Sequence, residues 1–212
     1  MRKYFITGTD TDCGKTYVTC KLLRFFNNQG LTAQALKPVA SGCTDFISED
    51  VLALQQDNYH SEQIINRWSF VPPISPHLAA QQCKEQLSVQ RIADFCQQEC
   101  FQTFDRLLIE GAGGLMVPLN DHETWVAFVR LLSIPVILVV GMRLGCLNHA
   151  LLTAEILKLK NLPCVGWIAN CIDNNMLFLD ENIATLSRLM PFPLLTTVNY
   201  GGVIENIAER LF

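Results

Sequence analysis

The sequence predicts a single α/β domain over residues 1–212, with a mostly parallel sheet and helices on both of its faces. Short apolar runs alternate with longer amphipathic segments, which is the rhythm of strands joined by crossover helices. The run Pro135–Gly141 is apolar throughout, as expected of a parallel strand covered on both faces. Half of the 212 residues are apolar and 17% are charged, so the chain can bury the core of one domain.

The predicted elements follow in regular order. Strands are expected at residues 3–7, 32–40, 106–114, 135–141, 164–171 and 194–198, the second of them broken at Pro38. Residues 15–30 and 146–161 have the apolar spacing of helices, and the first of these ends in Asn-Asn-Gln-Gly, a helix stop. A last helix is predicted over residues 205–212. Within segment 57–104, an extended proline-rich stretch at 71–77 precedes further helices.

Composition argues against several kinds of function. The formal net charge of −4 speaks against general nucleic-acid binding, which usually shows a basic surplus. The most apolar stretch, Ile134–Gly141, is too short to cross a membrane and the N-terminus lacks a signal-peptide core, so we expect a cytoplasmic protein. The nine cysteines are irregularly spaced and form no C-x-x-C pair, which predicts reduced apolar side chains rather than disulfides or a zinc site.

The segment GTDTDCGKT, Gly8–Thr16, predicts a phosphate-binding loop between a strand and a helix. Its glycines let backbone N–H groups face an anion, Lys15 can reach the outer phosphates, and the Thr16 hydroxyl can bind Mg²⁺. A glycine turn that only joins strand to helix is the alternative. The loop is one residue longer than the common G-x-x-x-x-G-K-[ST] pattern. Its carboxylates, Asp10 and Asp12, are expected to face outward, toward Mg²⁺ or a cationic substrate, or simply toward solvent.

Two further turns carry chemistry at strand ends. Lys37 stands four residues before Ser41, and Glu110 directly precedes three glycines within four residues. The carboxyl ends of parallel strands share one edge of the sheet, so these turns should meet the phosphate loop. We expect Lys37 to support a transferring phosphoryl group and Glu110 to bind Mg²⁺. The alternatives are an exposed lysine and a buried, hydrogen-bonded glutamate. Asp50 is a third metal candidate, or a first-turn residue of a helix.

Together, these segments resemble the dethiobiotin synthetase family of the biotin pathway. The match covers most of the chain in consistent order and rests on YFITGTDTDCGKT, KPVASG, DVLALQ, SPH, IEGAGGLMVPL, PVILVVGMRLGCLNHALLTA and GWIAN. The resemblance implies a single P-loop NTPase-like domain that works as a homodimer. It also implies an ATP- and Mg²⁺-dependent ring closure of 7,8-diaminononanoate with CO₂. In that reaction a carbamate becomes a carbamic–phosphoric anhydride, and the second amine then closes the cyclic urea of dethiobiotin.

The resemblance also implies roles for individual residues. The catalytic residues would be Lys37, Lys15, Thr11 and Ser41, and the Mg²⁺ ligands would be Thr16, Asp50 and Glu110. The nucleotide would contact Asp12, Cys13, Gly14, Lys15, Thr16, Tyr17, Asp50, Glu110, Gly113, Asn170, Asn199, Tyr200 and Glu205, with Asn170 at the adenine. The diamine would contact Thr11, Lys37, Ser41, Gly113, Gly114, Leu147 and Asn148. Its carboxylate tail would reach the segment Gly145–His149 of the partner subunit.

The chain departs from the family pattern at a few positions. Asp12 replaces a common Glu, Cys13 a common Val, and Cys171 a frequent Asp. The stretch TVNYGGVIEN departs from the Pro-aromatic pattern of the segment that closes over the base, where Tyr200 can replace the aromatic and Glu205 can reach the ribose. These departures leave open whether the chain uses ATP alone or several triphosphates.

Two other functions are compatible with a phosphate loop of this kind. A glutamine-dependent cobyrinate-type amidase normally carries a glutaminase domain, for which this chain is too short. A nucleotide-switched partitioning ATPase uses a second lysine near the start of the loop, where Thr9, Asp10 and Thr11 stand here. Phosphate release that requires the diamine and CO₂ would distinguish a synthetase from such a switch.

Overall fold

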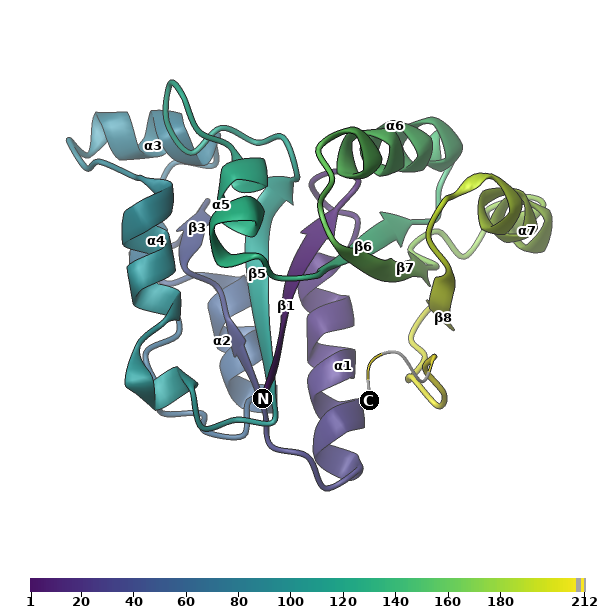
Figure 1. The fold of residues 1–212 in the computed structure, drawn as a ribbon, viewed down its shortest axis with the longest axis horizontal. Coiled ribbons are helices and arrows are strands. Elements are labelled where there is room, and N and C mark those ends of the chain that lie inside the picture. The colour runs from purple at the N-terminus through teal and green to yellow at the C-terminus, as the bar shows by residue number, and fades with distance from the viewer. Residues whose placement is uncertain (209–210, 212) are drawn as a thin grey trace.

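The computed structural model describes residues 1–208 and 211. Its main sheet has six strands, all paired in parallel, in the order β2-β5-β1-β6-β7-β8 (Figure 1). These strands are β1 Arg2–Gly8, β2 Ala33–Leu36, β5 Arg106–Gly114, β6 Val136–Gly141, β7 Cys164–Asn170 and β8 Leu194–Val198. A small parallel sheet pairs β3 Val39–Ser41 with β4 Trp68–Phe70. The predicted parallel α/β architecture is therefore confirmed.

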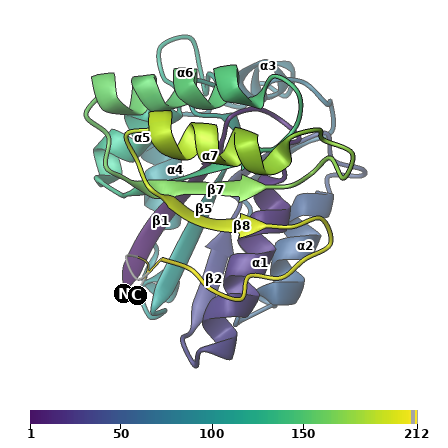
Figure 2. The same cartoon turned by 90° about the vertical axis from the view of Figure 1, so that its right-hand side faces the viewer.

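Helices cover both faces of the main sheet. Helices α1 and α2 lie on one face, and α5, α6 and α7 lie on the other (Figures 1 and 2). The helices are α1 Lys15–Asn28, α2 Glu49–Asp57, α3 Pro76–Gln82, α4 Val89–Cys96, α5 Trp125–Leu132, α6 Cys146–Leu159 and α7 Leu179–Leu189, with a 3₁₀ turn at Glu99–Phe101. The helices expected within residues 57–104 are thus present as α3 and α4.

The core is built on the two faces of the central strands. All six residues of β6 are buried, as its unbroken apolar sequence predicts. On the face of α5, the ring of Phe5 lies 5.3 Å from the ring of Trp125 and 5.5 Å from that of Phe128. The indole N–H of Trp125 donates to the carbonyl of Ala112 at 3.0 Å, so α5 also holds the end of β5 in place.

Two predicted elements differ from the structure in their extent. The expected strand 32–40 is broken at Pro38, and its second part, β3, belongs to the small sheet. The predicted terminal helix is wrong for residues 205–208, which are not helical; residues 209, 210 and 212 of that prediction lie outside the described part of the chain. The reason is an alternative partner: Ala208 N donates to Leu195 O at 3.1 Å, and Thr196 Oγ1 donates to Asn206 O at 2.9 Å. These bonds to β8 occupy the N–H of Ala208 and the carbonyl of Asn206, which a helix would use for its own hydrogen bonds.

Across the described residues, none of the helices combines the length and the apolar character that crossing a membrane requires.

Candidate active site

The phosphate loop, Gly8–Thr16, joins β1 to α1 and is pinned to the end of β7. The side-chain amide of Asn170 donates to the carbonyl of Cys13 at 2.9 Å. Gly14 has φ +81, and a Cβ at this position would lie 2.1 Å from Asn170 Nδ2. Only glycine satisfies both the backbone conformation and the close approach of that amide. The Lys15 ammonium curls back over the loop and donates to the carbonyl of Asp10 at 3.0 Å.

The two carboxylates of the loop have different surroundings. Asp10 accepts from the backbone N–H of Thr11 at 2.8 Å and from the Arg143 guanidinium at 2.7 Å. The cation that faces Asp10 is therefore a side chain of the protein, from the turn between β6 and α6. Asp12 is exposed and has φ +58, a left-handed conformation that Asp tolerates better than most residues. The sequence gives no signal for Arg143, because it stands far from Asp10 along the chain.

Lys37 joins the three predicted turns into one cluster. Its ammonium lies 2.6 Å from Glu110 Oε1 and 2.8 Å from Asp50 Oδ2. The hydroxyl of Thr16 donates to the same Glu110 oxygen at 2.6 Å. Lys37 is 4% exposed, Glu110 is fully buried, and the Asp50 side chain is 48% exposed. The structure thus brings together the start of α1, the residue after β2, the middle of β5 and the start of α2, so the three predicted turns meet as expected of a parallel sheet.

The charges in this cluster stabilise one another. Burial by itself lowers the pKa of Lys37, but the carboxylates of Glu110 and Asp50 more than offset it, so its pKa is raised above the usual value. Burial also opposes ionisation of Asp50. The charge and hydrogen bond of Lys37 outweigh that effect and hold the pKa of Asp50 below its usual value. The ammonium and the Asp50 carboxylate are therefore both charged at neutral pH.

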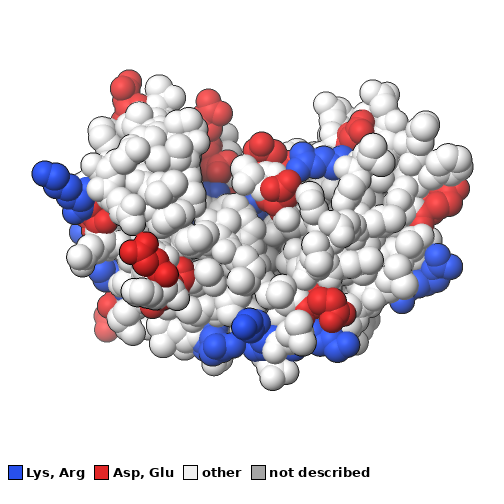
Figure 3. Space-filling view, turned by 90° about the horizontal axis from the view of Figure 1, so that it is seen from above, with Lys and Arg blue, Asp and Glu red and all other residues white. Residues whose placement is uncertain are grey.

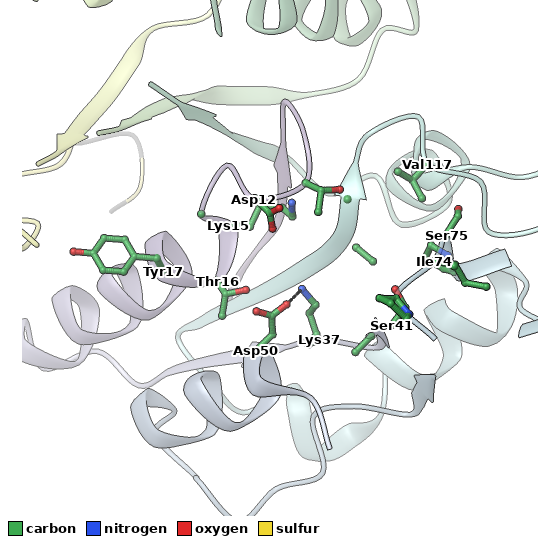
Figure 4. Close-up of a pocket in the computed structure, with 17 residues that line it drawn as sticks. Asp12, Lys15, Thr16, Tyr17, Lys37, Ser41, Asp50, Ile74, Ser75 and Val117 are labelled. Carbon is green, nitrogen blue, oxygen red and sulfur yellow. Dashed lines mark hydrogen bonds and ion pairs between the residues drawn. The ribbon is translucent and has the colours of Figure 1, made fainter. Parts of the chain in front are cut away.

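A cavity of about 630 Å³ opens above this cluster. Figure 3, seen from the carboxyl edge of the sheet, shows this face hollowed near its middle, with acidic and basic side chains close together. Figure 4 shows Lys37 and Asp50 on one side of the cavity and Ser41 and Ser75 on another. The predicted site residues that line it are Thr11, Asp12, Gly14, Lys15, Thr16, Tyr17, Lys37, Ser41, Asp50 and Gly113.

Some lining residues have no predicted role. Pro73, Ile74, Ser75 and Pro76 form one wall, and Val117 contributes to another (Figure 4). The first four belong to the proline-rich stretch 71–77, which runs into α3, and its extended conformation and the SPH segment are the sequence signals that pointed to this region.

The other predicted residues lie outside this cavity. Glu110 and Asn170 are buried beneath it, and Cys13 is buried with its carbonyl bonded to Asn170. Gly114 lines a second cavity of about 400 Å³ between the phosphate loop and α6. The remaining predicted positions are exposed or half-buried: Leu147 and Asn148 on α6, and Asn199, Tyr200 and Glu205 after β8.

The segment after β8 approaches the phosphate loop through Tyr17. The Tyr17 hydroxyl donates to the carbonyl of Gly202 at 3.2 Å, and Figure 4 shows its ring directed away from Lys37 and Asp50. The ammonium of Lys21 lies 4.9 Å from the centre of the same ring. The Tyr17 end of the site is therefore separate from the ion-pair cluster, and it adjoins the segment predicted to cover the base.

The donor set suits a magnesium ion that is delivered with phosphates. Thr16, Asp50 and Glu110 supply oxygen ligands, which Mg²⁺ prefers, and a metal–nucleotide site needs few protein ligands. Glu110 Oε2 is buried and has no hydrogen-bond partner among the described residues. A buried carboxylate oxygen without a partner is costly, and a cation would satisfy it.

Comparison with known proteins decides the family. An AAA domain family model matches residues 2–208. An ATP-dependent dethiobiotin synthetase BioD from Legionella pneumophila (strain Paris) is 51% identical over 211 residues, covering 98% of each chain. The chain belongs to the dethiobiotin synthetase family. Another family member, from Cellvibrio japonicus, is 48% identical over 204 residues, covering 93% of this chain and 89% of its own. The family predicted from the sequence is therefore confirmed.

Solved structures of other proteins are similar to this chain in their fold. A ParA family ATPase from Chlorobium tepidum superposes with a TM-score of 0.54 at 14% identity, over 94% of this chain and 84% of its own. The septum site-determining protein MinD from Pyrococcus horikoshii, solved with Mg-ADP, superposes with a TM-score of 0.54 at 18% identity, over 93% of this chain and 81% of its own. This chain therefore shares the P-loop NTPase fold with both proteins.

Proposed function

We propose that this chain is a dethiobiotin synthetase that closes 7,8-diaminononanoate and CO₂ into dethiobiotin at the expense of ATP. One observation carries the proposal: the phosphate loop, Lys37 and Ser41 line a single cavity at the carboxyl edge of the sheet. The reaction requires a site for the triphosphate and, beside it, a site for a small polar substrate, and one cavity with this lining can supply both. The full-length relation to the dethiobiotin synthetase family supplies the identity of that substrate.

The reaction divides into three balanced steps. One amine of the diamine attacks CO₂ and loses a proton, which gives a carbamate. A carbamate oxygen then attacks the γ-phosphorus of ATP, and ADP leaves, which gives a carbamic–phosphoric anhydride. The second amine attacks the carbonyl carbon of the anhydride, loses a proton and expels phosphate, so the five-membered cyclic urea forms. Because the anhydride is labile in water, the protein acts chiefly by positioning, charge neutralisation and exclusion of water.

Each catalytic side chain has a position that suits its proposed role. Lys15 and Lys37 are cations at two sides of the cavity and would stabilise the charge that develops as the phosphoryl group moves. Thr11 and Ser41 offer hydroxyl groups to the carbamate, and Gly113 lets a backbone N–H approach it closely. Gly113 has φ +66, a left-handed backbone conformation that glycine adopts readily.

Thr16, Asp50 and Glu110 would hold Mg²⁺, which when bound neutralises charge on the phosphate oxygens. On this proposal Asn170, Asn199, Tyr200 and Glu205 receive the base and ribose. Asn170 already serves as an anchor for the loop, because its amide donates to Cys13 O.

Asp12 is proposed to attract the diamine. A dicationic substrate that approaches an anionic nucleotide gains from an exposed carboxylate near the mouth of the cavity. Asp12→Asn should then raise the KM of the diamine more than the KM of ATP, and an unchanged diamine KM would refute this role.

The proposed working form is a homodimer in which the segment Gly145–His149 of each subunit receives the substrate tail of the other. Leucine side chains are exposed along α6 and in the turn before it: Leu144 is 97% exposed in the turn, and Leu152 and Leu159 are 59% and 70% exposed on the helix. Exposed apolar side chains gathered on one segment are typical of an interface. Leu152→Glu should therefore shift the protein toward monomer in analytical ultracentrifugation. Leu189→Glu, on α7 at the same 59% exposure, is the matched control.

The remaining partners follow from the reaction. The chain would act in the cytoplasm, where ATP is available, and neither a nucleic acid nor a membrane takes part. Its net charge of −4 fits a small-molecule enzyme.

The proposal is tested by following carbon from bicarbonate. With ¹³C-bicarbonate, Mg-ATP and the diamine, the product should be dethiobiotin labelled at its ureido carbon, as read by mass spectrometry. Without ATP the label should not enter an acid-stable product. A chain that turns over ATP and leaves all label in bicarbonate would refute the proposed reaction.

A further inference from the structure

The carboxylates of Asp50 and Glu110 already have a cation beside them, and that cation is Lys37. The ammonium lies 2.8 Å from Asp50 Oδ2 and 2.6 Å from Glu110 Oε1, and the Thr16 hydroxyl donates to the same Glu110 oxygen. Figure 4 marks the Lys37–Asp50 contact with a dashed line, on the side of the cavity that these two residues form. The side chains proposed to bind Mg²⁺ are therefore the ones that hold the proposed catalytic lysine.

We propose that Lys37 is the resident counter-ion of the metal site, and that Mg²⁺ arriving with the nucleotide displaces its ammonium from Asp50 and Glu110. Released from the two carboxylates, Lys37 turns into the cavity toward the transferring phosphoryl group. The inference rests on the proposed function for the identity of that group. It makes the position of the lysine dependent on the metal, so that Lys37 is available for catalysis when the metal and the nucleotide are both in place.

Charge balance favours this exchange. The two carboxylates and the one ammonium bonded to them carry a net charge of −1, and Glu110 Oε2 has no hydrogen-bond partner within the described residues. A divalent cation neutralises both carboxylates and gives that oxygen a partner. An ammonium and a divalent cation on the same pair of carboxylates repel each other at close range. The pair therefore accommodates either Lys37 or the metal.

The anchoring of Lys37 allows its side chain to move while its backbone stays fixed. Its N–H donates to Ile65 O at 2.9 Å, and its carbonyl accepts from Asn66 Nδ2 at 2.7 Å. The side chain beyond these anchors is a flexible four-carbon stem, and it lines the cavity, so it has room to turn. The only large movement that the exchange requires is a rotation of this stem.

The exchange can be followed on the ammonium itself by NMR. With ¹⁵N-labelled lysine, the Nζ signal of Lys37 is assigned by its loss in Lys37→Arg. In the free protein we expect a slowly exchanging signal, because the group is buried and bonded to two carboxylates. A non-hydrolysable ATP analogue in EDTA should leave its chemical shift unchanged. Addition of Mg²⁺ in excess of EDTA should move it.

Several outcomes overturn the proposal. A Lys37 signal that does not move when Mg²⁺ and the analogue are both present would show a static ion pair. An equal shift with the analogue alone would show that phosphate, and not the metal, releases the lysine. The absence of a protected signal in the free protein would show that the ion pair does not persist in solution.

Metal binding to the nucleotide-free protein gives a second measurement. Mn²⁺ titrated against wild type and Lys37→Met, and read by electron paramagnetic resonance, should bind the variant at least tenfold more tightly, because no ammonium competes. Lys160→Met removes an equal charge from the exposed end of α6 and should leave Mn²⁺ affinity unchanged. Equal Mn²⁺ affinity in wild type and Lys37→Met would contradict the exchange.

These experiments separate the exchange from the proposed reaction. Neither uses the diamine or measures dethiobiotin. A chain that makes no dethiobiotin can still show the metal-dependent shift of Lys37, which would refute the proposed function alone. An active synthetase with an unmoved Lys37 signal would refute the exchange alone.

Discussion

Glu110→Gln tests the energetic role of the ion-pair cluster. The substitution keeps the shape of a fully buried side chain and removes its charge. The substitution takes one of its two carboxylates from Lys37. Loss of one member of a buried ion pair costs about 3–5 kcal/mol. Asp50 still faces Lys37, which places the cost at the lower end of that range. The new amide N–H₂ replaces an oxygen that has no partner among the described residues, so one unpartnered group takes the place of another and this exchange adds little. We expect a loss of about 3 kcal/mol.

The assay is urea unfolding followed by circular dichroism, in EDTA, so that no metal contributes. Glu85→Gln is the matched control, because it also removes a carboxylate paired with a cation, Arg91, but both side chains are more than a third exposed. Surface pairs of this kind contribute at most about 1 kcal/mol. If the two variants lose the same free energy of unfolding, with unchanged urea dependence, then the buried cluster does not stabilise the fold and the reasoning is refuted.

Further outcomes follow from the same contacts. Asn170→Ala removes the amide that pins the phosphate loop, and we expect at least fivefold weaker binding of a fluorescent ATP analogue; unchanged affinity would contradict the anchoring role. Because Lys37 lowers the pKa of Asp50, the stabilisation from that carboxylate is complete above its ordinary pKa of 3.8 and is lost as the pH falls through the lower folded-state value. Urea unfolding across acidic pH should therefore show a shallower loss of stability in Asp50→Asn than in wild type. Brief alkylation of the native protein at pH 8, read by intact mass spectrometry, should label Cys83 and Cys100 first, because these are the two exposed cysteines.

Burial should also keep other thiols unreactive. Burial is the largest cause that raises the pKa of Cys20 and that of Cys164 to about 12, so neither forms appreciable thiolate near neutral pH. Rapid labelling of more than two thiols would indicate that the described packing opens on the time scale of the reaction.

Much of the fold could be predicted because its signals are local. The apolar run in β6 and the strand–glycine–helix order around Lys15 depend on neighbouring residues alone. The meeting of Lys37, Glu110 and Thr16 also follows from topology, since parallel strands end at one edge. The sequence therefore predicted the cluster, while the direction in which each side chain faces required the structure.

The remaining features depend on contacts that no local pattern encodes. Arg143 meets Asp10 across most of the chain, and nothing in its own neighbourhood marks it as a partner of the phosphate loop. Residues 205–208 have the composition of a helix but run along β8, because the open edge of that strand offers hydrogen bonds. In the second case, tertiary partners overrode local helix propensity.

ATP cleavage and ring closure are coupled in the proposed reaction, and the most direct test measures phosphate release and dethiobiotin in the same reaction. Mg-ATP should be stable with the enzyme until both 7,8-diaminononanoate and bicarbonate are added. Phosphate and dethiobiotin should then appear one for one. Phosphate release that is indifferent to the diamine would contradict the account. It would leave a phosphate loop whose second substrate is different, or a nucleotide switch, and the roles of Lys37, Ser41 and Asn148 would have to be reassigned.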